Sequence, residues 1–230
     1  MIKIFLDTAD LNLVTNYRND ERICGFTTNP TLMRNAGVKN YLSFAKTYLD
    51  LLDGRPLSLE VFADSESEMI KQAHALGKLS KNIYVKIPIF FTNGQSTANV
   101  IKELSGIIKL NITAVTHASQ LNFLQNYSLA SNSLIISYFA GRVADAGYDF
   151  IEIAKEVRRV ITNENIELLW ASTREIHNIK HATQSSFDII TITPDLFKKL
   201  DGFGKNLDQI SIDTIKMFYG DAIKSKFKLP

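Results

Sequence analysis

Short apolar runs recur along the chain at the spacing expected for strands that are separated by helices. Eight runs rich in β-branched and apolar residues lie at residues 2–6, 23–26, 57–61, 83–87, 107–112, 134–139, 166–171 and 188–192. Each has four to six residues, the usual length of a strand. Segments between them, such as 67–79, 150–161 and 174–182, space their apolar residues as amphipathic helices do. The pattern predicts a strand and a helix in alternation, repeated eight times.

This alternation favours an α/β fold with a parallel sheet. Eight repeats in about 200 residues fit a closed (β/α)8 TIM barrel with right-handed crossovers, and an open doubly wound sheet is the alternative. No Pro- or Gly-rich linker divides the chain, so we expect a single barrel domain over residues 1–230. Residues 206–225 have an amphipathic pattern and are expected to form an extra C-terminal helical segment, which would cap the barrel or join subunits.

One lysine interrupts the apolar run at 83–87. Because side chains alternate across a strand, Ile83, Val85 and Ile87 form an apolar face suited to the surrounding helices, and Lys86 faces the other way. The same alternation in the neighbouring strands turns further polar residues toward the barrel interior. The inward-facing set is Glu60, Lys86, Asn111, Thr113 and Ser137.

A second set of polar residues lies at the carboxyl ends of the predicted strands. Barrel enzymes build their active sites at this rim, because the eight strand-to-helix loops meet there. For Ser, Thr and Asn the alternative is a structural role as the N-cap of the next helix. The residues at these positions are Asp7, Thr27, Thr28, Asn29, Thr113, Arg142, Ser172 and Arg174.

Lys86 is the candidate for the central chemistry. A lysine in an apolar interior loses solvation of its charged form, which favours a neutral amine that can attack a carbonyl and form a Schiff base. The alternative is an ion pair between Lys86 and Glu60, in which the lysine stays charged. Glu60 and Thr113 flank Lys86 on the adjacent strands and could hold a water as a proton relay.

Three further residues complete the candidate chemistry. Cleavage of a carbon–carbon bond needs a group that takes the proton from a hydroxyl, and Asp7 is placed to do so. Arg142 and Arg174 offer planar guanidinium groups that can grip a phosphate bidentately.

Composition narrows the possible partners and setting. Lys and Arg number 26 against 24 Asp and Glu, a net charge of +2, so neither nucleic acid nor a charged membrane surface is an expected partner. Cys24 is the single cysteine, and no apolar run approaches the roughly 18 residues of a membrane span, so a cytoplasmic location is expected. His177 and His181 lack the glutamate of the zincin pattern, and no metal or cofactor is expected.

Five motifs carry a resemblance to a known family. They are "GFTTNPTL" (25–32), "YVKIPI" (84–89), "LNITAV" (110–115), "ISYFAGR" (136–142) and "WASTR" (170–174). With them the sequence resembles the transaldolases, specifically the small-subunit branch that includes the fructose-6-phosphate aldolases. The resemblance implies that Lys86 is the Schiff-base lysine, Asp7 the acid/base for bond cleavage, and Glu60 with Thr113 the proton relay. It also implies a set of substrate-binding residues, namely Thr28, Asn29, Asn111, Ser137, Phe139, Arg142, Ser172 and Arg174.

The implied reaction transfers a dihydroxyacetone unit from a ketose phosphate, such as fructose 6-phosphate or sedoheptulose 7-phosphate, to an aldose phosphate in the non-oxidative pentose phosphate pathway. The alternatives are an aldolase that uses the same lysine and a barrel that binds sugar phosphates without turnover. The aldolase branch carries Gln at the position of Glu60 and Tyr at that of Phe139, which places this chain on the transaldolase side. Relatives in the small-subunit branch form pentamers and decamers, so the resemblance also implies a homo-oligomer.

Overall fold

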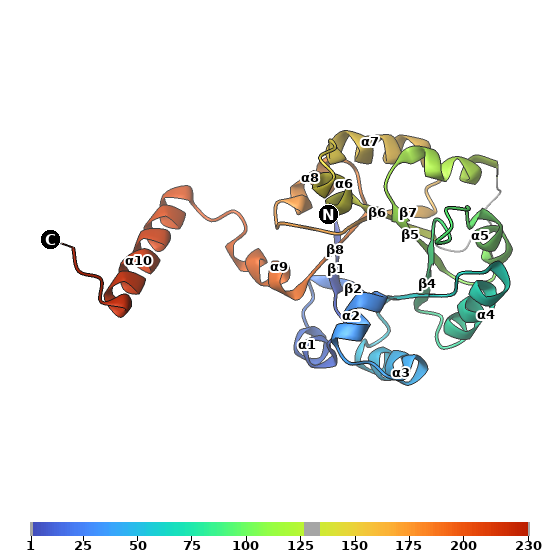
Figure 1. Ribbon diagram of the computed structural model, residues 1–230, viewed down its shortest axis with the longest axis horizontal. Coiled ribbons are helices and arrows are strands. Elements are labelled where there is room, and N and C mark those ends of the chain that lie inside the picture. Colours follow the sequence, from blue (N-terminus) through green and yellow to red (C-terminus); the bar gives the residue numbers. More distant parts are fainter. Residues whose placement is uncertain (1, 127–133, 230) are drawn as a thin grey trace. The chain divides into compact units, whose positions relative to one another are not determined.

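The computed structural model describes residues 2–126 and 134–229 and contains a closed parallel barrel (Figure 1). Eight strands follow one another around the barrel in sequence order, and β1 pairs with β8 to close it. The predicted TIM barrel is therefore confirmed, and the open-sheet alternative is wrong. The strands are β1 (Lys3–Asp7), β2 (Ile23–Thr27), β3 (Leu57–Glu60), β4 (Ile83–Pro88), β5 (Leu110–Val115), β6 (Leu134–Phe139), β7 (Ile166–Ala171) and β8 (Ile189–Ile192).

Helices surround the strands, and several begin at a side-chain cap. Asp10, Asn40 and Asp149 accept hydrogen bonds from main-chain amides in the first turn of α1, α3 and α7, which satisfies donors that the helix itself leaves unpaired. The α-helices are α1 (Leu11–Tyr17), α2 (Pro30–Asn35), α3 (Tyr41–Leu51), α4 (Glu66–Gly77), α5 (Ala98–Leu104), α6 (Ala140–Asp145), α7 (Phe150–Val160), α8 (Asn178–Gln184), α9 (Pro194–Lys198) and α10 (Leu207–Ser225). Two 3-10 helices are η1 (Ala118–Asn126) and η2 (Lys199–Gly202).

The fifth strand lies three residues later than its apolar run predicts. The run begins at Ile107, which is exposed, whereas pairing with β4 begins at Leu110 and continues to Thr113. The register with β6 then shifts between Ile112 and Val115, where Ala114 has a φ of 63°. This bulge places one extra residue in β5 at the carboxyl end of the barrel.

The alternation of side chains divides the barrel into two layers. Ile83, Val85 and Ile87 are buried on the outer face, as predicted. Inside the barrel, a cluster of apolar residues fills the region against which Phe139 packs. The cluster consists of Phe5, Tyr84, Ile135, Leu169, Ala171 and Ile189. The barrel is therefore a packed core rather than a channel.

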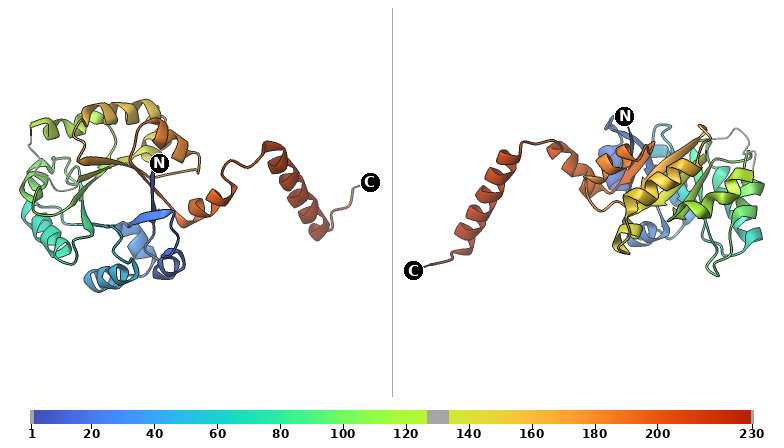
Figure 2. Two further views of the ribbon diagram at one scale, coloured as in Figure 1. Left: turned by 180° about the vertical axis from the view of Figure 1, so that it is seen from behind. Right: turned by 90° about the horizontal axis from the view of Figure 1, so that it is seen from above.

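The start of β1 and the yellow segment after β6 lie at opposite ends of the barrel (Figure 2, right). Consequently Figure 1 looks onto the end that carries the strand-to-helix loops and helices α2 and α6. None of the described helices combines the length and apolarity needed to cross a membrane.

The chain divides into two compact units after Phe197. The first unit is the barrel, and the second contains η2 and α10. Helix α10 begins at Leu207, directly after Asn206, whose side chain caps the first turn, and it ends at Ser225, close to the predicted segment 206–225. Many of its apolar side chains are exposed, including Ile215, Phe218 and Ile223.

Candidate active site

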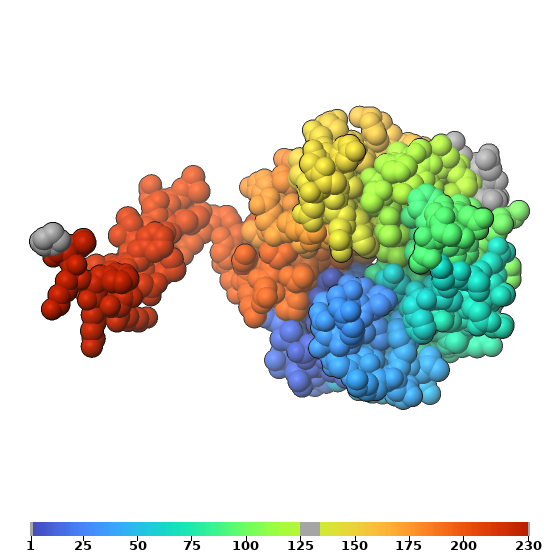
Figure 3. Space-filling view, viewed as in Figure 1, coloured from blue at the N-terminus to red at the C-terminus, as the bar shows by residue number. Residues whose placement is uncertain are grey.

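A cavity of about 510 Å³ opens at the carboxyl ends of the strands. It lies where the blue, yellow and green segments meet at the centre of the face shown in Figure 3. Its lining includes nine of the predicted site residues: Asp7, Asn29, Glu60, Lys86, Ser137, Phe139, Arg142, Ser172 and Arg174. The volume falls in the range of about 300–1,000 Å³ that is typical of small-molecule sites. The carboxyl-end position agrees with the rule for barrel enzymes.

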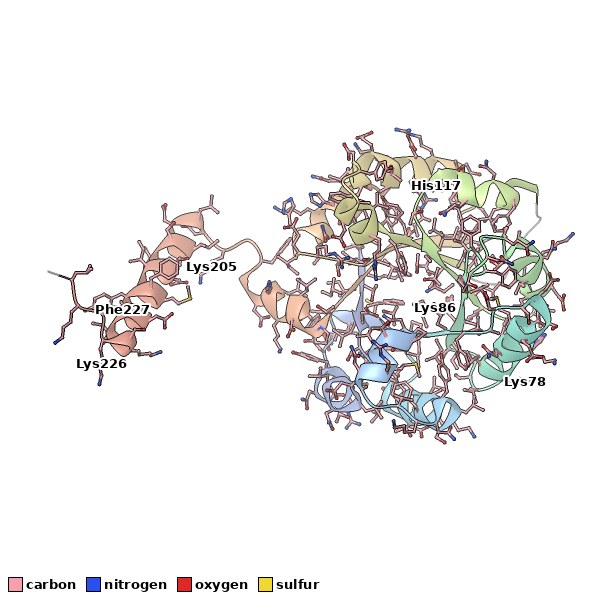
Figure 4. The ribbon with its side chains drawn as sticks, viewed as in Figure 1. Lys78, Lys86, His117, Lys205, Lys226 and Phe227 are labelled. Carbon is pink, nitrogen blue, oxygen red and sulfur yellow. The ribbon has the colours of Figure 1, made fainter. Side chains whose placement is uncertain are left out.

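Lys86 projects into the barrel interior from β4 and is 6% exposed (Figure 4). Its Nζ lies 3.0 Å from Glu60 Oε2, and it donates a hydrogen bond of 3.1 Å to the main-chain oxygen of Thr28. Glu60 is the register partner of Lys86 on β3, so the strand pairing itself brings the two charges together. The ion pair that was the alternative interpretation of Lys86 is therefore present, and it lines the same cavity.

A row of buried polar side chains crosses the barrel interior beside Lys86. Ser137 on β6 donates a 2.7 Å hydrogen bond to Asn111 Oδ1, and Asn111 Nδ2 donates at 3.1 Å to Ser58 Oγ on β3. Asn111 is the register partner of Lys86 on β5 and is fully buried. Of these three residues only Ser137 lines the cavity, so Asn111 lies behind it and fixes its hydroxyl.

Asp7 stands at the end of β1, on the cavity wall. Burial raises the pKa of its carboxyl group, while the positive charge of Lys86 and a hydrogen bond from Thr27 lower it. Thr27 Oγ1 donates this bond to Asp7 Oδ1 at 2.7 Å, and it also lies 2.6 Å from Thr191 Oγ1 on β8. Glu60 contributes a further, smaller upward shift to the pKa of Asp7. Asp7, Glu60 and Lys86 are thus electrostatically coupled in one site.

Two further residues with hydroxyl groups, Tyr41 and Thr113, lie outside the cavity lining. The Tyr41 hydroxyl donates a 2.7 Å hydrogen bond to the main-chain oxygen of Glu60, and burial, followed by the charge of Glu60, raises the pKa of that tyrosine. Thr113 is 1% exposed, and its Oγ1 has no hydrogen-bond partner among the described residues. A buried hydroxyl without a hydrogen-bond partner is energetically unfavourable, so this Oγ1 requires a small polar group as its partner.

The cavity lining also includes both predicted arginines, Arg142 and Arg174. Arg174 Nε lies 3.1 Å from each carboxylate oxygen of Asp145, and Nη2 also contacts this carboxylate. The hydrogen bond from Arg174 lowers the pKa of Asp145, and the charge of Arg142 lowers it further. Both guanidinium groups therefore lie near one carboxylate at the rim. Ser172 lies between β7 and Arg174 and has a φ of 61°.

Asn29 combines a structural role with a place in the cavity. Its Oδ1 accepts a 3.0 Å hydrogen bond from the Leu32 amide and caps α2, which is the structural role that the sequence offers as the alternative for Ser, Thr and Asn. Asn29 nevertheless lines the cavity.

Three predicted residues, Thr28, Asn111 and Thr113, do not line the cavity. Thr28 presents its main-chain oxygen to Lys86, and its own Oγ1 is buried without a partner among the described residues. Several residues could not be found from the sequence, because side chains that meet between elements far apart in the sequence leave no local signal. Those residues are Tyr41, Ser58, Asp145 and Thr191, together with Thr27, which was placed at the rim but not assigned to the site.

A (β/α)8 barrel with a lysine, two carboxylates and two arginines around a sugar-sized cavity has the features of a barrel enzyme. The sequence matches the model of the Transaldolase/Fructose-6-phosphate aldolase family over residues 4–228, and the chain belongs to this family.

Named relatives agree with this family assignment, and solved structures agree with the fold. A protein of Clostridium kluyveri named "Probable transaldolase" is 34% identical over 189 residues, which are 80% of this chain and 83% of that protein. A protein of the same name from Bartonella tribocorum is 31% identical over 201 residues, covering 86% of this chain and 88% of the other. Among solved structures, N-acetylneuraminate lyase from Mycoplasma synoviae superposes with a TM-score of 0.52 at 9% identity, covering 95% of this chain and 80% of that chain. At that identity the last comparison supports the fold alone.

Proposed function

We propose that this enzyme is a transaldolase that transfers a dihydroxyacetone unit from a ketose phosphate to an aldose phosphate through a Schiff base on Lys86. The observation that carries the proposal is the position of Lys86 Nζ in the cavity, 3.0 Å from the carboxylate of Glu60. The family and the names of the relatives support transaldolase-type chemistry.

The first step is attack of the Lys86 amine on the ketose carbonyl at C2. Glu60 Oε2 is close enough to take the ammonium proton, which leaves the nitrogen lone pair free to attack. The carbinolamine that forms must lose its hydroxyl as water, so a proton has to be delivered to that hydroxyl. The partnerless Oγ1 of buried Thr113 supports a role for this residue, with Glu60, in holding the water that relays protons.

The second step breaks the bond between C3 and C4. Asp7 takes the proton of the C4 hydroxyl, C4 becomes the aldehyde carbon of the departing aldose phosphate, and the electron pair of the broken bond moves into the Schiff base to give an enamine. Burial raises the pKa of Asp7 above that of an ordinary aspartate, which suits a group that must accept a proton and later return it. The enamine carbon then attacks the aldehyde of the acceptor, and Asp7 returns the proton to the new hydroxyl.

The remaining cavity residues are assigned to substrate binding. Arg142 and Arg174 at the rim, with Ser172 beside them, would hold the phosphate group, since guanidinium groups match phosphate geometry. Asn29 and Ser137 would bind substrate hydroxyls, and Asn111 would act through its hydrogen bond with Ser137. Thr28 would act through its main-chain oxygen, which contacts Lys86.

Two residues of the cavity support the proposal that dihydroxyacetone is transferred to an acceptor and not released. Glu60 and Phe139 line the site at the positions where, by the resemblance noted above, the aldolase branch carries Gln and Tyr. The reaction is assigned to the non-oxidative pentose phosphate pathway in the cytoplasm, with sugar phosphates as the small-molecule partners and without a metal or cofactor.

Borohydride trapping tests the assignment of Lys86. After incubation with fructose 6-phosphate and borohydride, we expect a stable dihydroxyacetone adduct on Lys86, located by peptide mass spectrometry. Lys86→Met should show no adduct, while Lys78→Met, in the exposed turn after α4, should trap as the unaltered protein does. Equal trapping by Lys86→Met would refute the mechanism.

A second experiment separates transfer from release. Glyceraldehyde 3-phosphate formation from fructose 6-phosphate is measured with and without erythrose 4-phosphate as acceptor. We expect product formation to depend on the acceptor and to be matched by sedoheptulose 7-phosphate. Equal rates in both reactions, with free dihydroxyacetone accumulating, would establish the aldolase function instead.

We also propose that the protein is a homo-oligomer, a pentamer or a decamer, assembled through the C-terminal helix. The exposed apolar side chains of α10 support this proposal, because exposed apolar surface that is concentrated on one element is characteristic of interaction sites.

A further inference from the structure

We propose that Thr191 on β8 is a positioning residue for Asp7 and acts through the hydroxyl of Thr27. This inference rests on the proposed function, in which Asp7 exchanges a proton with the substrate hydroxyl. Thr191 is not among the residues that the family resemblance implies for the site, and it lies on the strand that closes the barrel against β1.

The geometry forms a chain of two short hydrogen bonds across three strands. Thr27 is the register partner of Asp7, and Thr191 is the register partner of Phe5, two residues before Asp7 on β1. Thr27 Oγ1 lies 2.7 Å from Asp7 Oδ1 and 2.6 Å from Thr191 Oγ1. One hydroxyl thus connects the carboxylate at the end of β1 with the hydroxyl on β8.

The number of protons fixes the direction of the chain. A hydroxyl has one proton to donate, and an ionised carboxylate can only accept. When Asp7 is ionised, Thr27 must give its proton to Asp7, so the bond between the two threonines requires Thr191 as the donor. When Asp7 is protonated, it can donate to Thr27, which then donates to Thr191. Thr191 therefore offers Thr27 a donor in one state and an acceptor in the other.

The surrounding structure holds Thr191 in place for this role. It is 6% exposed, and Thr173 Oγ1 donates a 3.1 Å hydrogen bond to its main-chain oxygen. Gly25 leaves room for the ring of Phe5, whose Cζ would lie only 2.6 Å from a Cβ at that glycine. The Phe5 ring thus lies against β2. Phe5 and Gly25 are register partners, and they form the inward-facing pair directly before Asp7 and Thr27. Both threonine hydroxyls are in reach of the cavity, because Thr27 and Thr191 line it.

Loss of the Thr191 hydroxyl should raise the pKa of Asp7. Hydrogen bonds in series strengthen one another, so Thr27 donates more strongly to the carboxylate when it accepts from Thr191. Because hydrogen bonds to a charged acceptor are stronger than those between neutral groups, the ionised form of Asp7 loses more than the protonated form, and the pKa rises. The other titratable groups that act on Asp7 are Lys86 on β4, Glu60 on β3 and Tyr48 on α3, and the substitution leaves all of them unchanged.

The experiment compares Thr191→Val, which removes the hydroxyl at nearly constant shape, with Thr191→Ser, which retains it. Thr191→Ala provides a second variant without the hydroxyl in case the valine variant folds poorly. The Asp7 carboxyl is titrated by carbon-13 NMR, assigned with Asp7→Asn, and the pH profile of kcat/KM is measured in parallel. We expect Val and Ala to move both curves to higher pH and to lower kcat/KM about two- to threefold on the low-pH side, while Ser follows the unaltered protein.

The outcomes separate this inference from the proposed function. An unchanged Asp7 titration in both hydroxyl-free variants overturns the role of Thr191, whether or not the enzyme is a transaldolase. A raised KM without a shift of either curve also overturns it, because that result identifies a substrate contact. A shifted titration with an unshifted kcat/KM profile overturns the assignment of Asp7 as the catalytic acid/base, and with it the role of Thr191 in the reaction.

Discussion

Gly141 offers the sharpest test of how the proposed phosphate-binding side of the cavity is built. It lies on α6, directly before Arg142, and packs against the backbone of Ser172 in the loop after β7. A Cβ at position 141 would lie 2.9 Å from both the carbonyl carbon and the Oγ of Ser172, and closer still to the carbonyl oxygen. Gly141→Ala therefore forces two segments apart that both carry residues of the cavity wall.

The size of the displacement follows from bond lengths. A carbonyl oxygen lies about 1.2 Å from its carbon, so an oxygen that points at the new Cβ must retreat by more than about 1 Å to restore an ordinary contact. The obstacle is backbone, which cannot turn aside as a flexible side chain can. Overpacking of this kind costs about 1–3 kcal/mol, and each kcal/mol lowers Tm by about 2–4 °C at this chain length. A 1 Å misplacement of a binding group can cost about 100-fold in rate.

Three measurements test this reasoning. Gly141→Ala should lower Tm, should raise the inhibition constant for inorganic phosphate about tenfold, and should reduce kcat/KM for fructose 6-phosphate by one to two orders of magnitude. The control is Gly202→Ala, where an added Cβ meets nothing within 4 Å and should change none of the three. A Gly141→Ala protein with unchanged Tm and phosphate inhibition would show that the contact with Ser172 does not set this wall.

Three further predictions concern other parts of the chain. Burial raises the pKa of Asp7 above 3.8, so its charge destabilises the fold above the folded-state pKa and costs nothing below about pH 3.8. Asp7→Asn should therefore raise Tm at pH 7 and lose the gain at pH 3.5, and borohydride should trap the uncleaved fructose 6-phosphate on Lys86 in this variant. Because Ser172 has a φ of 61°, which glycine adopts without strain, the free energy of unfolding in urea should be about 1 kcal/mol higher for Ser172→Gly than for Ser172→Ala. Equal values would show that the backbone at Ser172 is not strained. A double variant, Ile215→Lys and Phe218→Lys, should dissociate the proposed oligomer in light-scattering measurements, whereas Lys216→Gln should leave it intact. A monomeric unaltered protein would refute assembly through α10.

The order of elements could be predicted because hydrophobic periodicity is local. Each strand needs one apolar face against the helices, and that requirement is visible at Ile83, Val85 and Ile87. Boundaries were less certain, because neighbouring strands decide where pairing starts. The 174–182 helix in fact begins at Asn178, whose Oδ1 accepts hydrogen bonds from the amides of Arg174 and Glu175 and holds that segment as a turn.

The inward direction of Lys86, Asn111 and Ser137 could also be predicted, because strand alternation fixes which face a side chain occupies. The hydrogen-bond and ion-pair partners of these residues could not be predicted. The contact between Thr27 and Thr191 joins residues 164 positions apart in the sequence, and it exists only because β8 closes on β1. Arg174 and Asp145 are likewise brought together by the adjacent β6 and β7, since Asp145 ends the helix that follows β6 and Arg174 lies in the loop after β7.

The ion pair between Lys86 and Glu60 was first the alternative to a nucleophilic lysine, and the structure gives a reason to treat both as one arrangement. A purely structural ion pair is best placed where its charges are closed off and fully hydrogen-bonded, since an incompletely compensated buried charge is costly. Here the pair lines an open cavity together with Asp7, Ser137 and two arginines. Glu60 also lies where a proton leaving Lys86 can go. In the proposed mechanism, the same 3.0 Å contact that pairs Lys86 with Glu60 is therefore the route by which a proton can leave the amine when a carbonyl arrives.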